Sequence, residues 1–327
     1  MTILIVEGLA RVYRKAGSIA VVDEENNRVE VSLPDLELVV IVGECVRITS
    51  SAIITLLSQG APVVFLSGRS DAYGVLFDVV QIGSVTIREA QYNCFSSTSC
   101  RLAYSKPVIL SKLKGLYNVL RYEYKYYKEQ LKDFEQLKYS ILEVIESVKN
   151  ASDVDELRNL EAQGSRYFWS LASNLIPEKY GFTGRKPRGG DVINSAIDFT
   201  YAVLYGIVTK AIVSAGLDPF YGMMHTTKPG RVSLTYDLSE VFKPIAVHAV
   251  IQASRKANLK TFAGSKLLKP KSIEVLVRHL YYRLYKESEN LFKRKSIWYL
   301  PIREVQKFKD SLLKNIAYEP YIYDPTP

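Results

Sequence analysis

Short apolar runs separated by polar turns occupy the first 77 residues of the chain. Turn-forming residues lie between them, at 16–18, 23–27 and 33–35. Strands spaced about ten residues apart with polar turns are typical of a small sheet sandwich. Residues 51–60 predict one short helix within it, ending at Gly60. The predicted strands are 3–6, 19–22, 29–31, 36–42, 45–48, 63–66 and 75–77.

From about residue 84 the apolar positions recur every three to four residues, which is typical of helices. The run from Leu113 to Val148 predicts one amphipathic helix, or two in line, that packs against neighbouring helices or, alternatively, forms a coiled-coil seam. Further helices are predicted at 153–175, where Asp153 begins a capping box, and at 191–215. The tail from 318 to 327 is expected to fray. The fold class is therefore α+β, with a small N-terminal β-sandwich-like domain (1–80) before a larger all-helical catalytic domain (81–327).

Composition predicts a soluble protein in a reducing compartment. The chain has 327 residues and 47% hydrophobic content, which is enough for two domains with ordinary cores. No apolar run reaches the ~20 residues that span a bilayer, and the nearest, 201–213, is interrupted by Lys210. The chain has an odd number of cysteines, and their spacing does not fit a zinc site, so we expect reduced thiols. These cysteines are Cys45, Cys94 and Cys100. We expect a cytoplasmic protein with no membrane contact and no secretory signal.

Positive charge gathers near the C-terminus. Residues 251–315 hold sixteen Lys or Arg and five acids, whereas the whole chain carries only +9. Aromatic residues, among them Tyr281, Tyr282 and Trp298, lie between these cations. Cations interleaved with aromatics are typical of a nucleic-acid partner. The alternative is a solvated basic helix face whose tyrosines pack inward.

One histidine and two acids predict a metal site. His225 precedes Asp237 and Glu240, whose spacing places both acids on one side of a helix start. Carboxylate oxygens with a single imidazole suit Mn²⁺ or Mg²⁺ and phosphodiester chemistry. The alternative is that these acids cap a helix and that His225 is a plain loop residue. His248 is ~16 Å further along a helix, too far to share the ion.

A third acid, Glu161, lies on a predicted helix beside Gly164 and Ser165. These small residues would allow another backbone or a substrate to approach closely. The alternative is a surface glutamate beside a helix contact. The chain has no Walker loop, nucleophile elbow or zinc-spaced cysteine set, which leaves nucleotide hydrolysis, serine hydrolase chemistry and a zinc finger poorly supported.

Taken together, these segments resemble the CRISPR-associated integrases, which insert new spacers into CRISPR arrays. The resemblance spans residues 88–244 in the family's order and fits the family's two-domain plan. Two departures are Lys243, where the family often has arginine, and Glu240 in place of aspartate. The matching segments are Arg88-Glu-Ala-Gln91, Leu160-Glu161-x-x-Gly164 with Tyr167-Phe168, Asp191-Val-Ile-Asn194 with Tyr201-Ala-Val-Leu-Tyr205, Gly216-Leu-Asp-Pro219 through His225, and Ser233-Leu-x-x-Asp237-Leu-x-Glu240-x-Phe-Lys-Pro244.

The resemblance implies a divalent metal, Mn²⁺ or Mg²⁺, held by Glu161, His225 and Glu240. Asp237 would be a nearby catalytic residue or a further ligand. The implied reaction is attack of a DNA 3′-hydroxyl on a phosphodiester, or of water in an endonuclease reaction. The resemblance also implies a homodimer formed through the N-terminal domain, and assembly with a small ferredoxin-like CRISPR-associated partner.

Several cations are candidates for binding double-stranded or branched DNA through its phosphates, a contact that gives affinity without sequence information. Two rival hypotheses remain at this stage: a non-catalytic DNA-binding scaffold with a basic C-terminal region, and a helical protein–protein adaptor. The candidate phosphate-binding residues are Arg166, Lys228, Arg231, Lys243, Lys293, Arg294 and Lys295.

Overall fold

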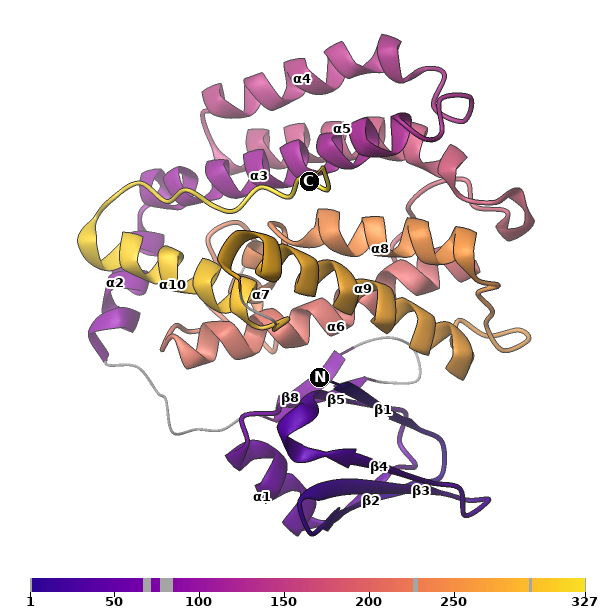
Figure 1. The fold of residues 1–327 in the computed structure, drawn as a ribbon. Helices are drawn as coiled ribbons and strands as arrows, with labels where there is room; N and C mark the ends of the chain where they lie inside the picture. Colours follow the sequence, from indigo (N-terminus) through magenta and orange to yellow (C-terminus); the bar gives the residue numbers. More distant parts are fainter. Residues whose placement is uncertain (1, 67–71, 77–84, 226–228, 294–295, 327) are drawn as a thin grey trace.

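The computed structural model describes residues 2–66, 72–76, 85–225, 229–293 and 296–326. Strands occupy the N-terminal part and helices the rest, so the predicted α+β class is confirmed. In Figure 1 the two sheets lie below a layered stack of helices. The expected domain boundary at residue 80 lies within 77–84, outside the described residues.

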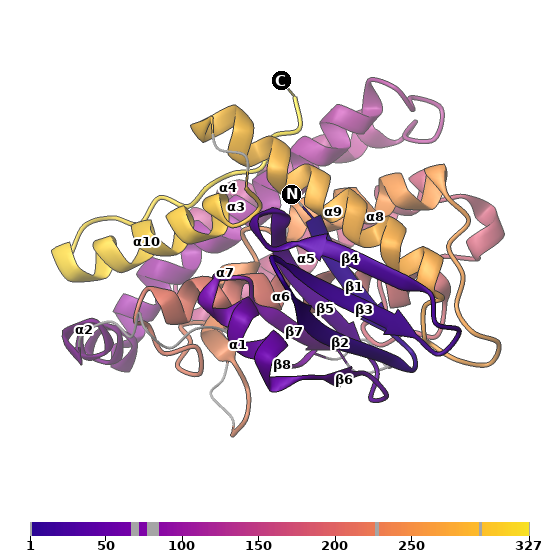
Figure 2. The same cartoon turned by 60° about the horizontal axis from the view of Figure 1, so that its bottom comes forward.

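Two four-stranded sheets make up the N-terminal part. The first has the order β1-β5-β7-β8, in which β1, β5 and β7 are parallel and β8 is antiparallel to β7. The second has the order β4-β3-β2-β6, and the short helix α1 packs against β2 (Figure 2). The elements are β1 (Thr2–Glu7), β2 (Ala10–Lys15), β3 (Ser18–Asp23), β4 (Arg28–Ser32), β5 (Leu36–Val42), β6 (Arg47–Ile48), α1 (Ser50–Ser58), β7 (Val63–Leu66) and β8 (Ala72–Leu76).

Strand β2 was not predicted because its buried residues Ala10 and Val12 are separated by polar side chains and form no apolar run. Strand β5, by contrast, is buried on both faces. Leu38 and Val40 join the core of the helical part, whereas Val39 and Ile41 join a second core beneath α1. The first sheet is therefore shared by both parts of the molecule, as expected for largely parallel strands covered on two sides.

The helical part consists of helices that pack in layers. The segment 113–148 is neither one helix nor two in line. Residues 125–133 separate α3 from α4, and the two helices pack against each other and against α5. Their apolar stripes therefore pack against neighbouring helices, the preferred of the two expectations. The elements are α2 (Val85–Ser96), α3 (Thr98–Tyr124), α4 (Phe134–Asn150), α5 (Val154–Ala172), α6 (Val192–Ser214), α7 (Ser233–Ser239), α8 (Lys243–Lys256), α9 (Pro270–Phe292) and α10 (Tyr299–Lys314).

Local capping chemistry explains where α5 and α6 begin. The Asp153 carboxylate accepts hydrogen bonds from the first-turn N–H groups of α5, and Asp191 does the same for α6. Helix α6 is long and apolar enough to cross a membrane by length and composition, but it packs against α7, α8 and α10. Gly206 brings it against the first sheet, because a Cβ there would lie 2.7 Å from Val64 Cγ2. It is the central core helix.

The expectation of reduced thiols was wrong for two of the three cysteines. Cys94 and Cys100 form a disulfide, while Cys45 is free and exposed. The turn at Ser97, between α2 and α3, brings the two sulfurs together. The number and spacing of the cysteines had therefore not indicated this bridge.

The expectation of a frayed C-terminus was also wrong. The tail runs along α3 as a strap (yellow in Figure 1), and the Tyr323 side chain is fully buried. Asn118 donates a hydrogen bond to the Tyr323 carbonyl at 2.9 Å, and Arg121 forms a 2.7 Å ion pair with Asp324. Aromatic burial thus anchors a segment whose lack of periodicity had predicted fraying.

Candidate metal centre and cationic groove

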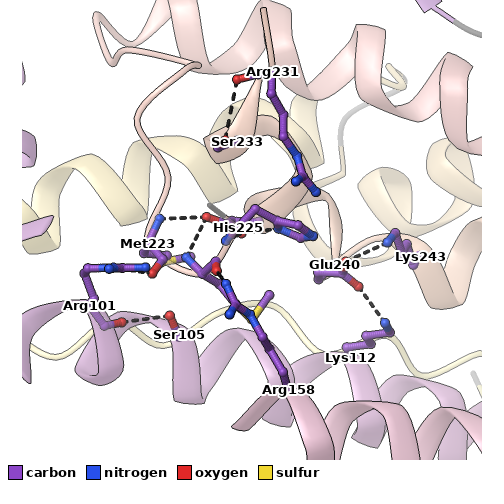
Figure 3. A network of polar contacts seen from close by, with 12 residues as sticks. Arg101, Ser105, Lys112, Arg158, Met223, His225, Arg231, Ser233, Glu240 and Lys243 are labelled. Carbon is purple, nitrogen blue, oxygen red and sulfur yellow. Dashed lines mark hydrogen bonds and ion pairs between the residues drawn. The ribbon is translucent and has the colours of Figure 1, made fainter. Parts of the chain in front are cut away.

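A buried carboxylate holds His225 in place. Asp237, on α7, is fully buried, and one of its oxygens accepts hydrogen bonds from the N–H groups of Met223 and Met224 at 2.7 and 3.0 Å. The other oxygen accepts the His225 N–H at 3.0 Å and contacts its ring Nδ1 at 2.5 Å. Because a carboxylate only accepts, Nδ1 carries the proton and the Nε2 lone pair is available. In Figure 3 the ring points toward Glu240.

The loop that leads to His225 is held from three other helices. Gln91 of α2, fully buried, donates to the carbonyls of Asp218 and Tyr221 at 2.9 and 2.7 Å. Arg101 of α3 and Arg158 of α5 donate to the carbonyls of the two methionines before His225, as Figure 3 shows. Side chains from three helices therefore hydrogen-bond to the backbone of this loop. The spacing of residues in the sequence did not predict these contacts. Gln91 did belong to a segment that carried the family resemblance.

Glu161 and Glu240 meet at Lys112, a residue that sequence reasoning missed. Lys112 of α3 forms ion pairs with Glu161 of α5 and with Glu240, at 2.7 Å from the latter's Oε2. Lys243 pairs with the other oxygen of Glu240 at 2.6 Å. Ser165 donates to Glu161 at 2.9 Å. Only the tertiary fold brings these groups together, because they come from segments far apart in the chain.

Two glycines allow the helices to converge at this point. A Cβ on Gly164 of α5 would lie 2.6 Å from Leu113 of α3, and one on Gly115 of α3 would lie 2.8 Å from Pro244. The neighbour of Gly164 is thus a leucine side chain of α3, where we had expected a backbone or a substrate. Close packing of α5 and α8 onto α3 is what places Glu161, Glu240 and Lys112 together.

Charge pairing decides the ionisation of the buried members of this cluster. Burial alone would raise the pKa of Glu240, but the positive charges of Lys112 and Lys243 outweigh it and lower the pKa to about 2. Burial alone would lower the pKa of Lys112, but Glu240 and Glu161 outweigh it and hold the pKa above its usual range. The cluster is thus a buried set of charges at neutral pH.

These residues fit a hard divalent cation in chemistry, though not yet in spacing. Among the residues that the structure describes, no three His, Cys, Asp or Glu side chains are close enough to hold a metal. Glu161 and Glu240, however, both contact one Lys112 nitrogen, so their oxygens lie within about 6 Å of each other. Glu240 Oε2 is buried and forms the ion pair with Lys112, but no hydrogen bond of acceptable geometry. Two carboxylates beside an available imidazole nitrogen are a donor set that Mn²⁺ or Mg²⁺ accepts.

A groove of about 1390 Å³ opens beside His225. Lys243 and Arg231, both predicted as phosphate contacts, line it with His225. Its other cations come from two segments absent from the predicted set, although the basic glycine-rich character of 181–190 had been visible in the sequence. These additional cations are Arg185, Arg188 and Lys266, and the aromatic lining residues are Tyr201, Tyr205 and Tyr236.

Two of the remaining predicted cations, Arg166 and Lys293, do not line this groove. Arg166 is exposed on α5 and is not among the lining residues. Lys293 follows the far end of α9, a 23-residue helix about 35 Å long whose near end follows Lys266. The predicted contacts Lys228, Arg294 and Lys295 lie outside the described residues.

The basic, aromatic C-terminal region is partly structural. Trp298 is buried and donates a hydrogen bond to the Glu37 carbonyl at 3.0 Å, and Lys210 lies over its ring. Arg255 pairs with Glu123 at 2.8 Å, and Lys307 with Glu304 at 2.9 Å. Part of this charge is thus neutralised within the fold, which favours the inward-packing alternative for these residues.

Comparison with known proteins agrees with the fold and the motifs. The family model described as "CRISPR associated protein Cas1" matches residues 3–281. A protein of Saccharolobus solfataricus named CRISPR-associated endonuclease Cas1 2 is 32% identical over 265 residues, covering 80% of this chain and 78% of that protein. The chain therefore belongs to the CRISPR-associated Cas1 family.

Two solved structures have the same fold. A casposase bound to an integration product matches with a TM-score of 0.84 at 22% identity, covering 100% of this chain and 94% of the other. A chain of a Cas6-RT-Cas1–Cas2 complex matches with a TM-score of 0.78 at 17% identity, covering all of this chain and 36% of the other.

Proposed function

We propose that this chain is a metal-dependent DNA integrase and endonuclease that inserts new spacer DNA into a CRISPR array. The observation that carries the proposal is the geometry around His225: an imidazole fixed by a buried carboxylate, directed at Glu240, and opening onto a cationic groove. Related proteins support it, since the S. solfataricus relative is named an endonuclease and the casposase was captured with an integration product.

In this proposal Glu161, His225 and Glu240 hold Mn²⁺ or Mg²⁺. When bound, the metal would supply a Lewis acid that neutralises charge on the phosphate and lowers the pKa of the attacking hydroxyl. Asp237 keeps the proton on Nδ1, so that Nε2 faces the site. It is therefore a positioning residue, and its buried hydrogen bonds leave no reason to count it as a ligand.

The groove cations would hold DNA backbone beside this centre. Arg231 and Lys266 can contact phosphates electrostatically, while Lys243, already paired with Glu240, lies at the boundary between groove and centre. The 3′-hydroxyl of the incoming DNA forms a new P–O bond as the target strand's P–O3′ bond breaks, and the target's own 3′-hydroxyl leaves. The number of phosphodiester bonds is unchanged. With water as nucleophile, the same site hydrolyses the bond.

Assembly is the less direct part of the proposal. We infer a homodimer formed by the N-terminal domain (1–80), in which β1 and β4 are edge strands of the described sheets, and residues 81–327 as the catalytic and DNA-binding domain. The solved Cas6-RT-Cas1–Cas2 complex supports a protein partner, which we infer to be small and ferredoxin-like. Light scattering of the purified chain tests the dimer, and co-purification with the small partner tests the complex.

The rival function is a non-catalytic DNA-binding scaffold. A short duplex with 3′-OH ends is incubated with supercoiled plasmid and Mn²⁺, and joined products and DNA affinity are both measured. The proposal predicts that Glu161→Ala abolishes joining but leaves DNA affinity within a few-fold. A duplex ending in a dideoxynucleotide is the matched control, because it lacks the attacking hydroxyl. Joining that persists in Glu161→Ala, or that needs no 3′-hydroxyl, would contradict the proposal.

A further inference from the structure

Lys112 occupies the position between two groups that the proposed function assigns to a metal. Its ammonium contacts both Glu161 and Glu240, and the residue is only 7% exposed. Long ammonium side chains are rarely buried unless they are paired. The ion pairs with Glu161 and Glu240 therefore account for the burial of the Lys112 ammonium.

The charges of the cluster balance with Lys112 in place. Lys112 and Lys243 supply two positive charges, and Glu161 and Glu240 supply two negative ones. A divalent cation added to this arrangement would lie within a few ångströms of the Lys112 ammonium in a poorly solvated site. Like charges at that separation repel strongly. The two cations therefore compete for the same carboxylates.

The contacts also show which partners each carboxylate keeps when Lys112 withdraws. Glu240 Oε2 lies 2.7 Å from the Lys112 nitrogen, yet it has no hydrogen bond of acceptable geometry. The other oxygen of Glu240 keeps Lys243 at 2.6 Å, and Glu161 keeps Ser165 at 2.9 Å. Withdrawal of Lys112 would leave Glu240 with Lys243 on one oxygen and with its other oxygen directed at the space the ammonium leaves. Glu161 would keep Ser165 on Oε1, the same oxygen that had faced the ammonium.

We propose that Lys112 is a built-in counter-ion that holds Glu161 and Glu240 together in the metal-free protein and is displaced when the divalent cation binds. This inference rests on the proposed function, because it concerns the same centre. Lys112 is here a positioning residue: it pre-assembles the carboxylates and lowers metal affinity. The centre would in consequence be stable without metal and would load only when the cation outcompetes the lysine.

The test measures Mn²⁺ affinity by calorimetry, together with the melting temperature in EDTA and in Mn²⁺. Lys112→Met keeps the length of the side chain but removes the charge. We expect it to bind Mn²⁺ at least tenfold more tightly than the wild type, to melt at a lower temperature in EDTA, and to gain more from Mn²⁺. Lys112→Arg, which keeps the charge, should behave like the wild type, and Lys114→Met, two residues along α3, is the matched control for helix packing.

A second measurement needs no variant, in case Lys112→Met does not fold. Amine acylation of the wild-type protein, read by mass spectrometry, should modify Lys112 slowly in EDTA and faster in Mn²⁺, whereas Lys114 should not change. Unchanged Mn²⁺ affinity in folded Lys112→Met, or unchanged Lys112 acylation when Mn²⁺ binds, would overturn the inference and leave the proposed function standing. Absence of Mn²⁺ binding by the wild type would overturn both.

Discussion

The prediction that follows most directly from the structure concerns Asp237→Asn. The wild-type carboxylate accepts three backbone N–H groups, from Met223, Met224 and His225, as well as the imidazole. Asparagine has nearly the same shape but only one accepting oxygen. If the NH₂ group takes the place of Oδ2, the buried N–H groups of Met223 and Met224 lose their acceptor. If it takes the place of Oδ1, the part-buried N–H and Nδ1–H groups of His225 lose theirs.

The magnitude follows from the cost of a buried unsatisfied donor, about 1–3 kcal/mol each. Two such donors predict that Asp237→Asn lowers the free energy of unfolding by roughly 2–6 kcal/mol. The ring of His225 also loses its orienting acceptor, and disturbing such outer-shell partners typically weakens metal affinity about 10–100-fold. Urea unfolding measures the first effect, and Mn²⁺ titration of the folded protein measures the second.

Asp218→Asn is the matched control, because it changes the same residue type in the same loop. Asp218 is only half-buried, and its oxygens accept from the Tyr92 hydroxyl at 2.7 Å and the Phe220 N–H at 2.8 Å. A hydroxyl can accept from an amide instead of donating to it, so the expected loss is below ~1 kcal/mol. Equal stabilities for the two variants, with unchanged Mn²⁺ affinity in Asp237→Asn, would refute the reasoning.

Three further predictions follow. Gly222→Ala should reduce both stability and Mn²⁺ affinity, since a Cβ there would lie 2.5 Å from Asp237 Oδ2; thermal melting and calorimetry measure this. Cys94→Ser should lower the free energy of unfolding by about 2 kcal/mol, the loop entropy of a bridge spanning six residues to Cys100, as urea unfolding would show. Burial lowers the pKa of His248 from 6.5 to about 4, so on acidification the unfolded chain takes up a proton before the folded one does. The free energy of unfolding should therefore fall by roughly 3 kcal/mol as the pH drops from 6.5 to 4, and the full stability should be present above that range.

Each of these predictions has its own control. Gly190→Ala adds a Cβ in open space at an ordinary backbone angle and should have little effect, so equal losses in the two glycine variants would argue against the steric reasoning. Cys45→Ser removes an exposed free thiol and should leave stability unchanged. His248→Gln removes the titrating ring, and persistence of the full decline in stability in that variant would assign the pH effect to other groups.

Much of the fold could be predicted because its determinants are local. Short apolar runs between turns located most strands, and Asp153 and Asp191 marked helix starts through hydrogen bonds made within one turn. The predictions of a frayed tail and of reduced thiols were wrong because the determinants of these two features are not local. Their stability comes from contacts with α3 and from the turn at Ser97, which a periodic pattern does not record.

The candidate site divides in the same way. His225, Asp237 and Glu240 are close in sequence, so their spacing and their motif led to them. Lys112 and Gln91 act across long separations, 49 residues to Glu161 in one case and 127 residues to Asp218 in the other. Only the packing of α2, α3 and α5 brings such groups together, and a single sequence does not encode that packing in any local spacing.

The most direct test of the central claim is strand transfer by the wild type and by His225→Ala, with junctions sequenced from the products. The account predicts that wild-type protein, in Mn²⁺ and with the small partner present, joins 3′-OH ends to target phosphates, and that EDTA or the His225→Ala substitution abolishes joining. Equal yields of joined DNA from folded His225→Ala and the wild type, or joining that persists in EDTA, would contradict a metal centre built on this imidazole.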